Sequence, residues 1–219
     1  MIILIFLITK HVETKILLTA SSNSAVDNLL QRFRGDKDKL LQSCDAVGLV
    51  SCDIIRRYGT HLAPGFEKLL EDIHLDKRCR RIGEDGVSWT DEVQYKEETE
   101  ASYVLGGTLG SLALGRTIPA QRFSTTLLEE NGQTWPVEKI QALLRSERAF
   151  LIGDHKQLKT NVREVKLQWS GFATSLMERL GYTLGMCVLE MNYRSHPNVV
   201  TPFSDLLYGS MVESAKKRK

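Results

Sequence analysis

The chain has 219 residues, of which 42% are hydrophobic and 26% charged, a composition typical of globular proteins and not of disordered or collagen-like ones. Its 29 basic and 27 acidic residues give a net charge of +2; without the four basic residues Lys216–Lys219 the count is 25 against 27, or −2. This balance excludes nucleic-acid binding through overall charge, so any such site must be a local groove. The length also argues against a complete two-lobed motor ATPase, which needs roughly 300 residues at about 150 per domain.

The cysteines and the N-terminal run bear on location. Cys44, Cys52, Cys79 and Cys187 form no C-x-x-C pair, so we expect reduced thiols, a cytosolic or nuclear protein and no zinc site. The apolar run Met1–Ile8 is too short to cross a membrane, which takes about 20 residues, and no basic region precedes it as in a signal peptide. We expect a buried first helix there, and we predict a cytoplasmic protein with no membrane partner.

Short apolar runs alternate with helical periodicities along the chain. Strands are predicted at 15–20, 46–50, 102–105, 123–128 and 148–152, and helices at 25–33, 136–144, 172–180 and 199–208. Ser24 is the predicted N-cap of the first of these helices, and Pro136 and Pro202 fall in first turns of later ones. The charged segment 53–100 lacks a clean apolar period and predicts a mostly helical surface insertion, with Lys77–Arg81 on a solvated face. The alternation predicts an α/β fold with a parallel sheet.

Polar residues directly follow three apolar runs, two of them predicted strands and the third the run 188–191. Glu129 and Glu130 end the strand 123–128, and two adjacent acids there can orient a magnesium ion and polarise an attacking water. Gly153–Leu158 (Gly-Asp-His-Lys-Gln-Leu) follows the next strand and places Asp, Lys and Gln where phosphate could be sensed. Asn192–Pro197 (Asn-Tyr-Arg-Ser-His-Pro) joins an aromatic ring to an arginine suited to phosphate. In α/β sheets such residues gather beyond the carboxyl ends of the strands.

Together these motifs resemble superfamily 1 helicases, in particular the branch of the RNA-silencing helicase Armitage, and also the nonsense-mediated-decay helicase. Lys15–Asp27 resembles motif Ia, with Ser21 in place of the usual Pro. Gly153–Leu158 resembles motif III, Ser175–Leu180 the Ser-Leu-x-Glu-Arg-Leu that follows it, and Asn192–Pro197 the Tyr-Arg motif of the silencing branch. The resemblance implies a RecA-like lobe of the P-loop NTPase class and the start of a second lobe.

The resemblance also implies roles for single residues. Ser22, Asn23 and Thr108 would touch the backbone of single-stranded RNA. The catalytic group would comprise Glu129, Glu130, Gln157 and Arg194, with Glu129 holding Mg²⁺ beside ATP. Gln133, Asp154 and Tyr193 would bind the nucleotide: Gln133 and Gln157 sense the γ-phosphate, Asp154 couples that site to strand movement, and Tyr193 lies near the base, where core packing is the alternative. RNA-silencing or RNA-decay proteins are the implied partners.

The chain departs from the family pattern at its acids and at its phosphate loop. Motif II normally reads Asp-Glu-x-x-Gln, and Glu129 adds a methylene that displaces the carboxylate by about 1.5 Å, so hydrolysis should be impaired. The near match to a P-loop, Gly110–Thr117, is rejected because Pro119 and the strand 123–128 leave no room for the required helix. In the family the P-loop precedes motif Ia by one helix, and we expect Met1 to follow the place where it would stand.

We therefore predict an incomplete lobe: 1–52 its first part, 53–100 an insertion, 101–186 its remainder, and 187–219 the start of a second lobe with a basic tail. The predicted function is a fragment of an ATP-dependent RNA helicase with no helicase activity and negligible ATPase alone. One alternative is a non-enzymatic remnant that binds RNA or protein. Another is a small P-loop kinase using Gly110–Thr117, which would require nucleotide binding that Arg116→Ala abolishes.

Overall fold

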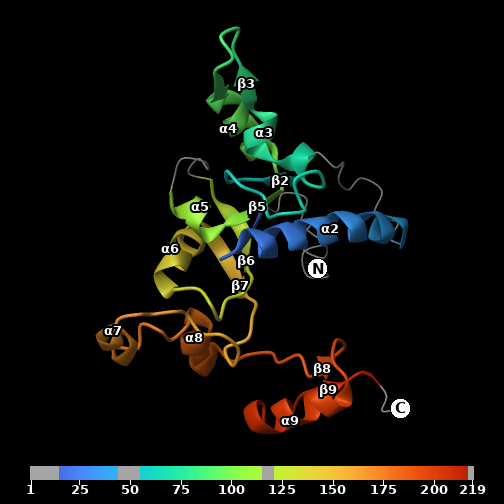
Figure 1. Ribbon diagram of the computed structural model, residues 1–219, viewed down its shortest axis with the longest axis vertical. Helices are drawn as coiled ribbons and strands as arrows, with labels where there is room; N and C mark the ends of the chain where they lie inside the picture. Colours follow the sequence, from blue (N-terminus) through green and yellow to red (C-terminus); the bar gives the residue numbers. More distant parts are fainter. Residues whose placement is uncertain (1–14, 44–54, 115–120, 217–219) are drawn as a thin grey trace. The chain divides into compact units, whose positions relative to one another are not determined.

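The computed structural model describes the chain except residues 1–14, 44–54, 115–120 and 217–219. The predictions for Met1–Ile8 and for a strand at 46–50 therefore lie outside the described residues. The chain divides into two compact units, one ending at Met177 and the other beginning at Glu178, and each is described by itself (Figure 1). Among the residues described, no helix has the length and apolar character needed to cross a membrane.

Unit 1 is built on a five-stranded parallel sheet in the order β2-β5-β1-β6-β7. Its strands are β1 (Ile16–Ala20), β2 (Ile55–Arg57), β5 (Val104–Thr108), β6 (Phe123–Leu128) and β7 (Ser146–Leu151). The predicted strands at 15–20 and 123–128 are confirmed, and those at 102–105 and 148–152 are confirmed with shifted ends. An α/β fold with this mostly parallel sheet fits a RecA-like domain.

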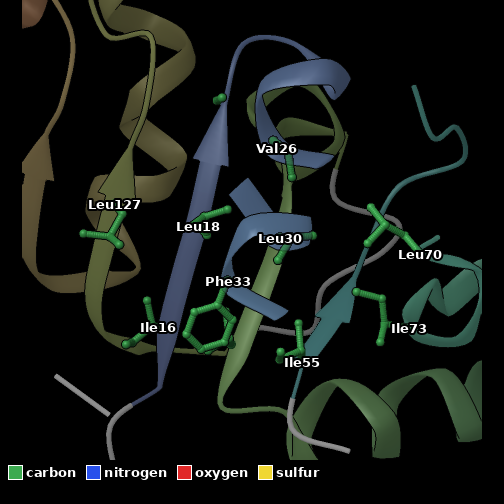
Figure 2. Packing of buried hydrophobic residues seen from close by; sticks show 11 residues of the cluster. Ile16, Leu18, Val26, Leu30, Phe33, Ile55, Leu70, Ile73 and Leu127 are labelled. Carbon is green, nitrogen blue, oxygen red and sulfur yellow. The ribbon is translucent and has the colours of Figure 1, made fainter. Parts of the chain in front are cut away.

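Helices cover both faces of the sheet, and alternate residues of its strands face opposite layers. Ile16 and Leu18 of β1 pack with α2 (Asn23–Ser43), as Figure 2 shows. Leu17 packs in the opposite layer, which includes residues of α5 (Leu109–Ala113) and α6 (Pro136–Leu144). This two-sided burial explains why the strands read as continuous apolar runs rather than as alternating ones.

The remaining elements are short or lie outside this sheet. In unit 1 they are η2 (Glu71–Ile73), α3 (Leu75–Arg78), β3 (Arg80–Ile82), β4 (Ser88–Thr90), α4 (Glu92–Ala101) and α7 (Val165–Trp169). Helix α8 (Leu176–Leu184) spans the division between the units, and unit 2 contains β8 (Met191–Asn192), α9 (Pro197–Leu207) and β9 (Glu213–Ser214). Cys79 and Cys187 are both free thiols.

The segment 53–100 differs from the predicted surface insertion. Its strand β2 pairs with β5 at the edge of the central sheet, and Leu70, Ile73 and Leu75 are buried in the two core layers. Only three residues long and two-thirds arginine, β2 has no apolar period that a sequence pattern could reveal. The hairpin of β3 and β4 beyond it is exposed.

The basic cluster Lys77–Arg81 pairs mainly with neighbouring side chains. Lys77 forms an ion pair with Glu71 at 2.9 Å, and Arg78 forms one with Glu98 at 2.6 Å. Arg81 lies 3.7 Å from an oxygen of Asp91. These pairs agree with a structural, solvated role for the cluster rather than with phosphate binding.

Three helix boundaries differ from the prediction. Helix α2 begins at Asn23, and the oxygen that accepts the Ala25 N–H (3.2 Å) belongs to Ser22, so Ser24 is not the N-cap. Helix α8 begins at Leu176 because turns occupy residues 171–174. Helix α9 begins with Pro197 at its first position, which leaves Pro202 inside the helix rather than in its first turn.

Two glycines at one end of β5 provide a test of this packing. A Cβ on Gly107 would lie only 2.2–2.4 Å from three ring carbons of Tyr58, whereas a Cβ on Gly110 in α5 would meet nothing within 4 Å. We expect Gly107→Ala to lower the free energy of unfolding by about 1–3 kcal/mol through overpacking. Gly110→Ala should leave it unchanged or raise it by up to about 1 kcal/mol, because alanine favours helix. Urea denaturation of both variants measures this, and equal stabilities would contradict the packing of Tyr58 on β5.

Candidate functional site at the carboxyl edge of the sheet

The parallel register brings the predicted site residues of unit 1 to one edge. Ala20 is in register with Thr108, Thr19 with Leu128, and Leu128 in turn with Leu151. The segments after β1, β5, β6 and β7 therefore emerge side by side. Thr108 is the last residue of β5, and the segments after β1, β6 and β7 carry, in turn, Ser22 and Asn23; Glu129, Glu130 and Gln133; and Asp154 and Gln157.

The loop after β1 and the acidic loop after β6 touch directly. The hydroxyl of Ser22 donates to Oε2 of Glu130 at 3.1 Å, and the hydroxyl of Ser21 donates to the same oxygen at 3.3 Å. Ser22 also accepts the Ala25 N–H, so its position is fixed by α2. The residue predicted to hold nucleic acid and the predicted catalytic glutamate are thus neighbours.

Glu130 has a strained backbone that its neighbours hold in place. Its φ is +52°, a left-handed value that costs a non-glycine residue roughly 1 kcal/mol or more. The Glu129 N–H donates to the carbonyl of Thr19 at 2.9 Å, and the Gln133 N–H donates to the carbonyl of Glu130 at 3.1 Å. Strain of this kind is retained where the surrounding structure fixes it, and it clusters at functional sites.

Lys139 of α6 holds the loop after β6 through Asn131. Its side chain is fully buried, and Nζ donates to the backbone carbonyl and to Oδ1 of Asn131, both at 2.8 Å. The Asn131 N–H donates to the carbonyl of Ile152 at 3.0 Å, which ties the loop to the end of β7. Burial lowers the pKa of Lys139 to about 8.

The acidic pair has donors suited to magnesium but does not form a cage. Burial, and then the neighbouring charge of Glu130, raise the pKa of the Glu129 carboxyl, and a bound cation would oppose both effects. The described part of the chain contains no cluster of three metal-ligating side chains. Mg²⁺ is commonly held by one or two carboxylates together with phosphate oxygens and water, so these residues fit a nucleotide-borne ion. Such an ion would neutralise developing charge on the phosphates.

The loop after β7 lies against the acidic loop. A Cβ added to Gly132 would lie 2.6 Å from the backbone carbonyl oxygen of Asp154, so only glycine allows this approach. Asp154 accepts the Lys156 N–H and the Nε2 of Gln157, each at 2.9 Å. Gln133 and Gln157 are both exposed. The residues predicted to sense phosphate therefore belong to two loops in contact.

The three residues predicted to contact nucleic acid differ in how much of each is free to meet a ligand. Oδ1 of Asn23 accepts from Nη2 of Arg57 at 2.7 Å, and Asn23 is half-buried. Thr108 caps α5 by accepting the Ser111 N–H at 3.2 Å and is only 9% exposed. Thr108 is therefore engaged in shaping its own turn, while Ser22 and Asn23 are more open to a ligand.

The near match to a P-loop does not have the conformation of one. Residues Gly110–Ala113 are helical, whereas a phosphate cradle requires an extended glycine-rich loop before its helix. This agrees with the rejection of the segment, whose end (115–117) lies outside the described residues. The alternative of a small P-loop kinase therefore lacks the phosphate-binding loop that it requires at 110–113.

In unit 2, most of the Asn-Tyr-Arg-Ser-His-Pro motif builds a turn. Oδ1 of Asn192 accepts the N–H groups of Arg194 and Ser195, both at 2.9 Å, and Nδ1 of His196 accepts the Asn198 N–H at 3.3 Å to cap α9. Tyr193 is 77% exposed. The turn thus displays Tyr193 and Arg194 rather than burying them, so core packing does not account for Tyr193.

Comparison with known proteins found helicases and nucleic-acid-binding proteins. The chain is 24% identical over 221 residues to DNA-binding protein SMUBP-2 of Rattus norvegicus, covering 89% of this chain and 22% of the relative. It is 29% identical over 206 residues to the regulator of nonsense transcripts 1 homolog of Arabidopsis thaliana (89% and 16%). It is 26% identical over 230 residues to DNA polymerase alpha-associated DNA helicase A of Schizosaccharomyces pombe (93% and 34%). No protein-family model matches the chain.

The chain is therefore similar, at 24–29% identity, to proteins that include helicases. It spans about a third or less of the length of these three proteins. These relatives do not single out the Armitage-like branch, and their names include both DNA and transcripts. The comparisons therefore support a likeness to helicases in general and not to one branch.

Several residues that shape this helicase-like edge are not evident from the motifs. Lys139 reads as a surface lysine in an amphipathic helix, and only its contact with Asn131 reveals its role. Arg57 lies in a segment predicted to be an insertion. Ser21 is the residue that sequence could have identified, because it replaces the proline of motif Ia with a hydroxyl.

The buried lysine predicts a specific pH dependence. The pKa of Lys139 falls from 10.5 to about 8 on folding, so between those values the unfolded chain binds more protons and folding is favoured by rising pH. The free energy of unfolding of the wild type minus that of Lys139→Met should rise by up to about 3 kcal/mol across this window. Subtracting the variant removes the contributions of tyrosines and cysteines.

Urea denaturation at several pH values gives the measurement. Lys156→Met, which removes an exposed lysine from the loop after β7, controls for the loss of one positive charge. A difference between wild type and Lys139→Met that stays constant from pH 8 to 10.5 would show that Lys139 is charged throughout, contrary to its burial.

Proposed function

We propose that the chain is part of the motor of an ATP-dependent superfamily 1 helicase, and that the carboxyl edge of its sheet holds the backbone of single-stranded RNA. The observation that supports this most is the hydrogen bond from Ser22 to Glu130, 3.1 Å long, between the nucleic-acid loop and the acidic loop. A motor must link nucleotide chemistry to its grip on the strand. Here the hydroxyl of Ser22, in the loop after β1, is bonded directly to Glu130, in the loop after β6.

On the nucleotide side, we assign Glu130 as the base that polarises water, with Glu129 beside the magnesium ion of ATP. Gln133 and Gln157 would sense the γ-phosphate, and Asp154, which already binds Gln157, would carry the signal to its loop. The exposed Tyr193 and Arg194 of unit 2 would serve base and phosphate. Electrostatic stabilisation of phosphoryl transfer requires such groups around the γ-phosphate.

The choice of RNA rests on the likeness to the silencing branch and on the relative named for nonsense transcripts. Contacts to the phosphate backbone do not themselves distinguish RNA from DNA. Silencing or decay proteins remain the proposed partners, and residues 187–219 the proposed start of a second lobe.

A binding module without hydrolysis is the second candidate. Glu129 in place of Asp favours it, since its longer side chain and the raised pKa of its carboxyl both weaken magnesium binding in its usual geometry. In this reading the edge holds the strand, and the acidic pair is a remnant.

Binding of a fluorescein-labelled oligouridylate to the purified chain tests the nucleic-acid function common to both candidates. We expect saturable anisotropy changes with an affinity that falls as salt rises, because phosphate contacts release counterions. Ser22→Ala should weaken binding about 5- to 10-fold, the usual effect of one lost hydrogen bond. Oligothymidylate measured alongside it would compare RNA with DNA.

Ser170→Ala is the matched control. The hydroxyl of Ser170 is also hydrogen-bonded locally, to the carbonyl of Leu167 at 2.8 Å, but Ser170 lies outside the segments that follow β1, β5, β6 and β7. It should bind like the wild type. Salt-independent binding, or equal affinities for the wild type and Ser22→Ala, would contradict the proposed edge.

A further inference from the structure

Arg57, at the end of β2, is a fully buried arginine whose three guanidinium nitrogens are all occupied. Nε donates to Oδ1 of Asp27 at 2.6 Å, Nη1 to the carbonyl of Tyr58, and Nη2 to Oδ1 of Asn23 at 2.7 Å and the carbonyl of His61 at 3.2 Å. The side chains of Arg57 and Asp27 are both 0% exposed. Four of its five N–H donors are thus used, and the buried side chain cannot reach a phosphate, so Arg57 can act on a ligand only through a neighbour.

That neighbour is Asn23, whose amide Arg57 orients. A guanidinium can only donate hydrogen bonds, so the atom of Asn23 that faces Arg57 must be the carbonyl oxygen Oδ1. The Nδ2 group, with its two N–H donors, is left on the other side of the amide. Among the described residues Nδ2 donates no hydrogen bond, and Asn23 is half-buried rather than covered.

We propose that Arg57 is a positioning residue which fixes Asn23 as a hydrogen-bond donor to a backbone phosphate. The inference rests on the proposed function and deepens it, because it names the atom that meets the strand and the reason for its polarity. Asp27 neutralises Arg57 in the core and accepts the Ala63 N–H at 2.7 Å. The pair thus fixes the polarity of Asn23 without placing a free charge at the edge.

The polarity matters because Glu130 already places a carboxylate against Ser22. An amide turned the other way would present a second acceptor to an anionic backbone. Held as it is, Asn23 adds donors next to the hydroxyl of Ser22. The loop after β1 then offers hydrogen-bond donors to phosphate without using a lysine or arginine side chain.

Asn23→Asp tests the inference with almost no change of shape. Its carboxylate can still accept from Arg57, so the urea unfolding midpoint should not fall. Its outer oxygen, however, replaces the donors with a negative charge. Asn23→Ala removes the donors without adding charge, and Asn198→Ala, at an exposed asparagine of α9 outside the segments after β1, β5, β6 and β7, is the control. The probes are fluorescein-labelled oligouridylate and the same sequence with an uncharged methylphosphonate backbone.

With the charged probe we expect Asn23→Ala to bind about 10-fold more weakly than wild type and Asn23→Asp about 50- to 100-fold more weakly, since repulsion adds to the lost hydrogen bond. With the uncharged probe the two variants should bind alike. If Asn23→Asp binds the charged probe as tightly as Asn23→Ala, or more tightly, the orientation by Arg57 is wrong while the proposed edge stands. If the wild type binds no charged probe, the proposed function and this inference both fail.

Discussion

The parallel register of the central sheet is the constraint on which the candidate site depends. Because all five strands run the same way, four of them deliver their following loops to one edge. Residues separated by more than a hundred positions, such as Ser22 and Glu130, meet there without any special device. The apolar strands supply the rigidity, since side chains on both faces are buried between helical layers. The site residues are therefore positioned by the sheet and oriented by their own loops.

Orientation comes from groups that never face a ligand. Lys139 holds the loop after β6 through Asn131, and Arg57 holds the loop after β1 through Asn23. Both are buried cations that contact the predicted site loops but not a ligand. Burying a charge costs free energy unless it is well hydrogen-bonded, and each is retained with its donors directed at a loop. Removing one partner of the Asp27–Arg57 pair would cost about 3–5 kcal/mol.

The sequence predicted the strands that carry motifs better than the elements that support them. The strand 123–128 and helix 136–144 agree with β6 and α6 because apolar period and turn residues coincide there. Strand β2 was missed because Ile55–Arg57 is short and its arginines are buried by partners far along the chain. Ser24 was a reasonable cap by residue type, but Ser22 supplies the oxygen. Burial of charge depends on tertiary contacts, which no local pattern contains.

The substitution of Ser21 for the motif's proline bears on how the two loops communicate. Proline has no hydroxyl, so the family pattern leaves Glu130 one serine donor, whereas this chain supplies two at 3.1 and 3.3 Å. Each hydrogen bond that Oε2 of Glu130 accepts from a serine uses part of its capacity to accept one from water. A phosphate that engaged Ser22 would compete for that hydroxyl and leave Oε2 of Glu130 more open to water. Binding of a nucleic-acid phosphate at Ser22 would thus free Oε2 of Glu130 from one hydrogen bond, by a local exchange that needs no movement of the sheet.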